Sequence, residues 1–221
     1  MDFAAWVNDA RRFAESIETL DGVTRFELDV AAPLPAKGVE RLSEKWPTGI
    51  PKPLQDFWCN GSQHFHCRYV WNPPPTRLLR LKSVFPSNNY IYGGPRFESA
   101  REIYPCNSGV EPGDEYMEEA IGEEAYRLWC ETAVIMHVGN GDLIALDQTA
   151  NAVDPPVMYL SHDDESSAVI SSSLADFLTS WARLCYIGPE IWLLKYWLDE
   201  SSGLIDTDRH LASELRDLLL N

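Results

Sequence analysis

The run from Ala133 to Asp147 constrains the fold most, because it predicts two adjacent antiparallel strands. Its apolar segments "AVIMHV" and "DLIALD" flank the turn Gly139-Asn140-Gly141. Gly and Asn accept the positive φ values that tight hairpin turns require. The turn could also suggest a phosphate loop, but no Lys-Ser/Thr pair and no helix follow it. We therefore expect a β-hairpin, and we expect no nucleotide or other cofactor.

Helical and strand patterns are mixed along the rest of the chain. Apolar spacings of three and four residues predict helices at both ends, and Ser173 with Asp176 forms a capping-box pattern. Helices mixed with mainly hairpin-connected strands indicate an α+β fold, a mostly antiparallel sheet flanked by helices. The expected helices are 3–20, 39–46, 51–59, 114–129, 174–184, 190–200 and 211–219, and the expected strands are 23–30, 64–71, 76–85, 133–138, 142–147 and 156–162, with an irregular stretch over 87–113.

Aromatic residues at helical spacing are assigned to buried faces. Tyr116 falls on the apolar face of the helix expected over 114–129, together with Ile121. Near the C-terminus, Trp192, Tyr196 and Trp197 have the spacing of one helix face. We expect all of them in the core or between helices, where large aromatic side chains are usually found.

Composition excludes several classes of function. The 221 residues carry a net charge of -16, which argues against direct binding to nucleic acid phosphates and favours basic partners. No apolar run is long enough to span a membrane, and the N-terminus lacks the pattern of a secretory signal. Five cysteines are an odd number, so we expect no disulfide framework and a reducing, cytoplasmic location.

The stretch "CNGSQHFHC", from Cys59 to Cys67, raises the question of a metal site. Structural zinc is usually held by two closely spaced Cys or His pairs that a longer loop separates. Here His64 and His66 fall on one face of a strand and Cys67 on the other. We therefore interpret the stretch as a turn, placed by Asn60-Gly61, and a core strand, and we expect no metal.

No catalytic constellation is visible, but two acidic concentrations are. The chain has no Gly-x-Ser-x-Gly elbow and no recognisable Cys-His signature, so we expect no enzyme activity. The stretch from Glu111 to Glu124 contains seven acids and no Lys or Arg, and a second group follows the strand at 156–162. Such groups are solvated surfaces or contacts for a cationic partner. The candidate contact residues are Glu115, Glu118, Glu119, Glu123, Asp163, Asp164 and Glu165.

Two stretches resemble the SUKH superfamily in its Smi/Knr-like branch. "GIPKPLQDFWCNGSQ" is similar to the family's Pro-led helix with an aromatic, followed by Asn-Gly and a strand. "GDLIALD" and "PVMYLSHDD", followed by the helix from Ser173, resemble the family's later motifs in order and spacing. The resemblance covers about 39–184 and implies one SUKH-like α+β domain over 1–185. A helical extension over 186–221, packed on the same domain, would follow it.

The resemblance implies binding and no catalysis. Bacterial members of this family are regarded as immunity proteins that bind and neutralise a cognate toxin domain, often a nuclease. Fungal members act as regulators or scaffolds, which leaves a scaffold role as the alternative. No catalytic residues define the family, so none are carried over. We expect an immunity protein with a toxin partner that has a basic surface, and no direct contact with nucleic acid or membrane.

Overall fold

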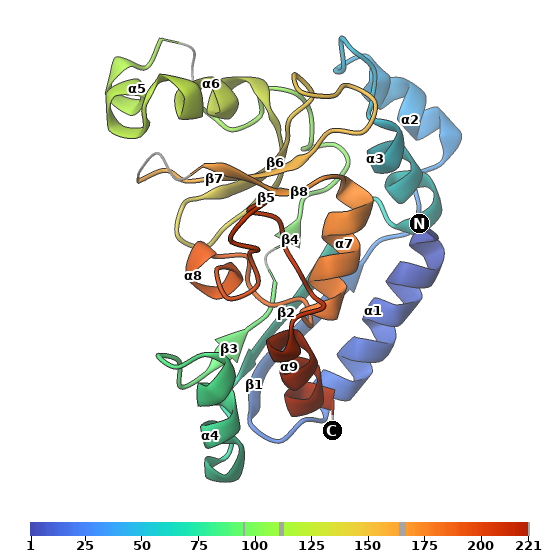
Figure 1. Ribbon diagram of the computed structural model, residues 1–221. Coiled ribbons are helices and arrows are strands. Elements are labelled where there is room, and N and C mark those ends of the chain that lie inside the picture. The colour runs from blue at the N-terminus through green and yellow to red at the C-terminus, as the bar shows by residue number, and fades with distance from the viewer. Residues whose placement is uncertain (95, 111–112, 164–166, 221) are drawn as a thin grey trace.

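The computed structural model describes residues 1–94, 96–110, 113–163 and 167–220 (Figure 1). Its helices are α1 (Phe3–Glu18), α2 (Ala36–Ser43), α3 (Lys52–Asp56), the π-helix η1 (Phe57–Gly61), α4 (Pro75–Val84), α5 (Glu115–Ile121), α6 (Glu123–Glu131), α7 (Leu174–Arg183), α8 (Ile191–Leu194) and α9 (His210–Leu220). Its strands are β1 (Val23–Val30), β2 (Phe65–Trp71), β3 (Ile91–Tyr92), β4 (Arg96–Phe97), β5 (Ala133–His137), β6 (Leu143–Leu146), β7 (Val157–Leu160) and β8 (Ala168–Ser171).

The strands form one antiparallel sheet, which confirms the α+β prediction. Within the described residues the order is β1-β2-β4-β5-β6-β7-β8, and β3 pairs with β2. The hairpin of β5 and β6 is confirmed, with Ala133 opposite Leu146 and His137 opposite Leu143. Gly141 has φ 103°, the left-handed value that makes Gly necessary in this turn. The strand predicted over 23–30 is confirmed with the same bounds.

Several predicted elements were wrong. Residues 76–85 form most of the helix α4, not a strand. The helix predicted over 190–200 shortens to α8, and Trp192, assigned to the core, is 42% exposed. The strand β8 was not predicted. The stretch from 87 to 113, predicted as irregular, supplies β3 and β4.

The helix that begins at α3 ends at Asn60-Gly61, but without the left-handed conformation that Asn and Gly often supply at a helix end. Neither residue has a positive φ. Instead the chain widens into the π-helix η1, and the Ser62 N–H donates to the Phe57 carbonyl at 2.9 Å. A Cβ on Gly61 would lie 3.1 Å from the Phe3 Cβ. Gly61 is therefore explained by its close approach to α1.

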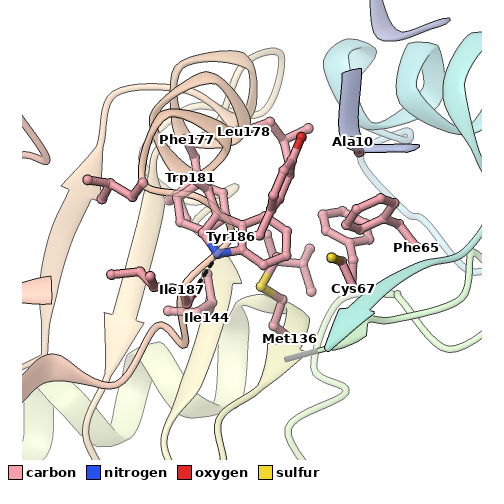
Figure 2. Packing of buried hydrophobic residues seen from close by; sticks show 14 of the residues in the cluster. Ala10, Phe65, Cys67, Met136, Ile144, Phe177, Leu178, Trp181, Tyr186 and Ile187 are labelled. Carbon is pink, nitrogen blue, oxygen red and sulfur yellow. Dashed lines mark hydrogen bonds between the residues drawn. The ribbon is translucent and has the colours of Figure 1, made fainter. Parts of the chain in front are cut away.

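The first face of the sheet, which carries Phe65, Cys67 and Tyr69 of β2, packs on the main core. Phe65, Phe97 and Met136 lie opposite one another on neighbouring strands and belong to the same buried cluster. Helices α1 and α7 cover this face (Figure 1). Figure 2 shows Trp181 and Tyr186 between them and the strands, where the Trp181 indole donates to the Ile187 carbonyl at 2.8 Å.

The second face, which carries His66 and Arg68 of β2, is covered at one end by α5 and α6. Leu143, Ala145, Met158 and Leu160 form a separate buried cluster there with Trp129. Strands β6 and β7 are thus buried on both faces, which explains why they are apolar without interruption. His137 lies opposite Leu143, so it shares the second face. At β2 and β4 this face carries polar side chains.

Side chains of the C-terminal region extend the main core. Leu193, Leu194 and Trp197 lie in the same buried cluster as α1 and the first face, and α9 adds Leu215 and Leu218. The α9 helix contacts both α1 and α4. The backbone of Ile187 pairs with Gly93, next to β3. The segment after 186 therefore completes the core and approaches the sheet.

The capping box of α7 provides a local test of the fold. The Ser173 Oγ accepts from the Asp176 N–H at 3.1 Å, as the sequence predicted. We expect Ser173→Ala to lower the free energy of unfolding by about 1 kcal/mol, because a helix N–H loses its acceptor. Urea unfolding would measure this. The neighbouring Ser172→Ala serves as the control, because the Ser172 hydroxyl donates to an exposed carboxylate, and an equal loss in both variants would contradict the assignment.

Candidate partner-binding surface

The acidic surface, defined as Glu115, Glu118, Glu119 and Glu123, lies on α5 and the start of α6. Among the described residues none of the four forms an ion pair. The nearby acids Glu124 and Glu131 of α6 are paired, because each lies 2.7 Å from the guanidinium group of Arg127. The surface therefore carries four negative charges that the described part of the chain does not compensate.

The acidic surface is built on two short helices, where the sequence predicted one. Asp114 caps α5 by accepting from the Met117 N–H at 3.1 Å. Gly122, with φ 83°, ends α5 and begins α6. The Tyr126 hydroxyl accepts from the backbone N–H groups of Gly113 and Asp114 at 2.6 and 2.8 Å, which holds the start of α5 against α6. A hollow of about 630 Å³ results, and both Glu118 and Glu123 line it.

Tyr116 was assigned to a buried face, and this was wrong. Its side chain is 83% exposed on α5, between Glu115 and Glu118. The break at Gly122 changes the helical phase, so the apolar spacing across 114–129 does not describe one continuous face. Tyr is among the residues that carry most binding energy at protein interfaces. Tyr116 is thus an exposed aromatic residue beside uncompensated acids, which the sequence analysis did not predict.

The second acidic concentration is described only in part. Asp163 is 77% exposed, and its Oδ1 lies 2.8 Å from the His162 Nε2. Asp164 and Glu165 lie outside the described residues, as does Glu111. The Trp129 indole donates to the Ser161 carbonyl at 3.1 Å, so α6 is attached to the chain just before Asp163. The structure thus links the acidic helices to this loop, but Asp163 already has a partner.

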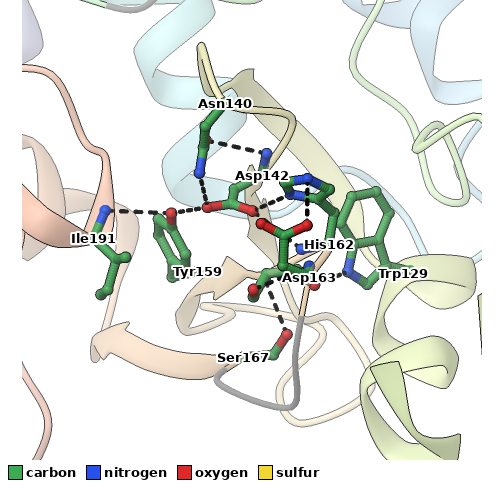
Figure 3. Close-up of polar contacts among 9 residues, drawn as sticks. Trp129, Asn140, Asp142, Tyr159, His162, Asp163, Ser167 and Ile191 are labelled. Carbon is green, nitrogen blue, oxygen red and sulfur yellow. Dashed lines mark hydrogen bonds and ion pairs between the residues drawn. The ribbon is translucent and has the colours of Figure 1, made fainter. Parts of the chain in front are cut away.

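A buried carboxylate network positions the hairpin against the same loop (Figure 3). The Asp142 side chain is 3% exposed, and it accepts from the Tyr159 hydroxyl and the Asn140 amide. It also accepts from the His162 N–H at 3.0 Å, and its Oδ1 lies 2.7 Å from the His162 Nδ1. Burial acts to raise the pKa of Asp142, but these hydrogen bonds outweigh it and lower the pKa.

The residues of this network belong to the two sequence motifs that resemble the family. Asp142 comes from "GDLIALD", while Tyr159 and His162 come from "PVMYLSHDD". The Tyr159 hydroxyl also accepts from the Ile191 N–H at 3.2 Å. The motif residues therefore join the hairpin, the end of β7 and the segment before α8. Their geometry fits a structural role.

The cysteine and histidine stretch forms part of the sheet. Cys67 is fully buried on the first face, while His64 and His66 are half-buried. Among the described residues no three His, Cys, Asp or Glu side chains are grouped as metal ligands. No helix in the described ranges combines the length and apolar character that crossing a bilayer requires.

The architecture defines an α+β protein with a buried polar network at one hairpin and an uncompensated acidic surface beside it. A model of the SMI1/KNR4 family (SUKH-1) matches residues 33–180, and the chain therefore belongs to that family. No curated protein and no solved structure gives a significant match. The family match ends within α7, before α8 and α9.

Proposed function

We propose that this chain is a cytoplasmic, non-catalytic immunity protein that binds a cognate toxin domain through the acidic surface and occludes it. The observation that carries the proposal is the lack of ion pairs at Glu115, Glu118, Glu119 and Glu123 in the described structure. The spacing Glu115–Glu119 is i,i+4, where like charges repel at about 0.2–0.5 kcal/mol per pair. A basic partner would turn this cost into attraction.

Three features support this function together. Membership in the SMI1/KNR4 family agrees with a toxin-immunity role. The net charge of -16 would steer a basic toxin towards the protein and accelerate association. Exposed Tyr116 would supply a contact with a large apolar area next to Glu115 on α5. A toxin that cleaves nucleic acid needs a basic substrate groove, which is the surface that an acidic protein fits.

The test is affinity capture of the tagged protein from its native host, with low-salt and high-salt washes and mass spectrometry. We expect one stoichiometric basic toxin domain, weakened but not removed by salt, because charge screening acts on exposed pairs. Co-expression should then protect cells from that toxin. Capture of a signalling or housekeeping protein would instead favour the scaffold role. A captured toxin that kills co-expressing cells as fast as controls would contradict immunity.

A further inference from the structure

A groove of about 480 Å³ opens on the second face of the sheet, outside the acidic surface. It lies over β2 and β4, beside the end of β5, and Arg68, Arg96 and His137 contribute to its lining. His66 lies opposite Arg96, and His137 lies opposite Leu143 on the face that α5 and α6 cover. The groove and the acidic helices therefore share one face of the sheet.

Aromatic side chains line part of this groove. Trp192 is 42% exposed, whereas the other seven Trp side chains of the chain are each 5% exposed or less. Tyr90 is also exposed, and its ring centroid lies 6.2 Å from that of Tyr92. All three side chains line the groove, and the faces of aromatic rings attract cations.

The Glu190 carboxyl group lies at the floor of the groove, 6% exposed. Within the described structure nothing donates a hydrogen bond to its Oε2. Burial raises the pKa of Glu190, although the Tyr92 hydroxyl and the Gly139 N–H lie beside the carboxyl group and favour its charged form. A buried carboxyl oxygen without a donor is costly, because it has lost water and gained no partner.

The position of Glu190 is fixed from both sides. Ile191, which follows it, donates its N–H to the Tyr159 hydroxyl of the Asp142 network (Figure 3). Gly188 donates its N–H to the Tyr92 carbonyl at 2.9 Å. A Cβ at Gly188 would lie 2.3 Å from the Glu190 Oε2 and 2.6 Å from the Tyr92 Cε2, so a larger residue there would displace these side chains. Glu190 and Trp192 both follow the family match, so the C-terminal segment adds this wall of the groove.

The cationic side chains of the groove differ in their partners. Arg96 lies 3.1 Å from Glu98 and 2.7 Å from Glu102. Arg68 is exposed on β2 and lies across from Glu27, whose carboxylate pairs with Arg25 at 2.8 Å, so the charge of Arg68 opposes a cation in the groove. Burial lowers the pKa of His66, which keeps it neutral near pH 7. Glu190 thus keeps a buried carboxyl oxygen without a donor in the described structure, and the N–H of an incoming cation would supply one.

We propose that this groove binds a cationic side chain, Arg or Lys, of a partner protein, which inserts between Trp192 and Tyr90 and donates to Glu190. The aromatic rings would hold the charged group by cation–π attraction, and its N–H groups would satisfy Oε2. The proposal goes beyond toxin immunity, because the groove would take such a side chain from any protein that carries it.

The test is a titration of the purified protein with N-acetyl-arginine amide and N-acetyl-lysine amide, followed by tryptophan fluorescence. Because Trp192 is the exposed indole, binding should change the emission saturably, with a dissociation constant in the millimolar range. Trp192→Phe should abolish the signal. The uncharged N-acetyl-glutamine amide and the anionic N-acetyl-glutamate amide should give no saturable change. A response to Arg alone or to Lys alone would still support the proposal and would identify the cation.

Two charge variants test the role assigned to Glu190. Glu190→Gln keeps the side-chain volume and should weaken binding at least about tenfold, while Glu200→Gln, an exposed change in the same C-terminal segment, should not. Arg68→Glu changes an exposed residue of β2, so the fold should tolerate it. Because it replaces a positive by a negative charge beside the groove, it should strengthen binding of the cation several-fold. Equal binding of the neutral or anionic probe, no saturable change with either cation, or equal affinity of Glu190→Gln would overturn the proposal. These probes involve no toxin, so the result is independent of the immunity function.

Discussion

Replacing Asp142 by Ala should lower the free energy of unfolding by about 3–5 kcal/mol, the largest loss that we expect from a single polar substitution here. The reason is that Asp142 is the shared acceptor of the Tyr159 hydroxyl, the Asn140 amide and the His162 backbone N–H. Each buried donor left without an acceptor costs about 1–3 kcal/mol. Urea unfolding followed by circular dichroism measures the loss directly.

The matched control is Asp163→Ala, which removes a carboxylate from the other side of the same His162 ring. Asp163 is largely exposed, so its ion pair is worth about 0–1 kcal/mol. Similar losses in the two variants would mean that the network around Asp142 does not contribute as its geometry implies. Trp192 fluorescence would also respond in Asp142→Ala, because Tyr159 ties this network to the Ile191 backbone.

The same network gives a signed pH dependence. The pKa of Asp142 is lowered in the folded state from its ordinary 3.8, so the unfolded state binds the proton more readily. The stabilisation is therefore fully present above about pH 5 and is lost as pH falls through 3.8 towards the folded pKa. Unfolding measured against Asp142→Asn should show the difference between the two proteins shrinking below pH 4. A difference that stays constant from pH 7 to 3 would contradict the assignment.

The sequence predicted those parts of the fold that local chemistry specifies. The hairpin at Gly139-Asn140-Gly141 and the capped helix α7 depend on residues that lie next to one another in the chain, and both were confirmed. The helix α4 was missed because Leu and Val in "TRLLRLKSVF" suit a buried strand as well as a helix. Pro75 at its first turn was the available signal for a helix start.

The sites depend on contacts that no local pattern encodes. The acidic residues of α5 and α6 could be listed from charge, but the exposure of Tyr116 follows from the break at Gly122. The groove requires that β4, only two residues long, joins β2 to β5. It also requires that Glu190 and Trp192 return to the sheet from the C-terminal segment. Such pairings are set by tertiary packing, which overrides the local preference of short segments.

Reversing the charges of Glu115, Glu118, Glu119 and Glu123 to Lys should slow association with the captured toxin partner about 10–100-fold at low salt. These four carboxylates have no ion pairs in the described structure, so the substitution breaks no internal contact of that kind. Association rates measured over a range of salt concentrations should also lose most of their salt dependence, because long-range attraction is what salt screens.

The control for this variant must match its net charge. The control variant replaces four other exposed acids by Lys and so makes the same change of charge. They lie on α1, on α2 and just after α2, and are Glu15, Glu18, Glu40 and Glu44. If the acidic surface contacts the partner, the first variant should be much slower than the second, and Tyr116→Ala should raise the dissociation rate without slowing association. Equal slowing in both charge variants would mean that only the total charge matters. The contact site would then have to be sought elsewhere, beginning with the groove at Trp192 on the same face of the sheet.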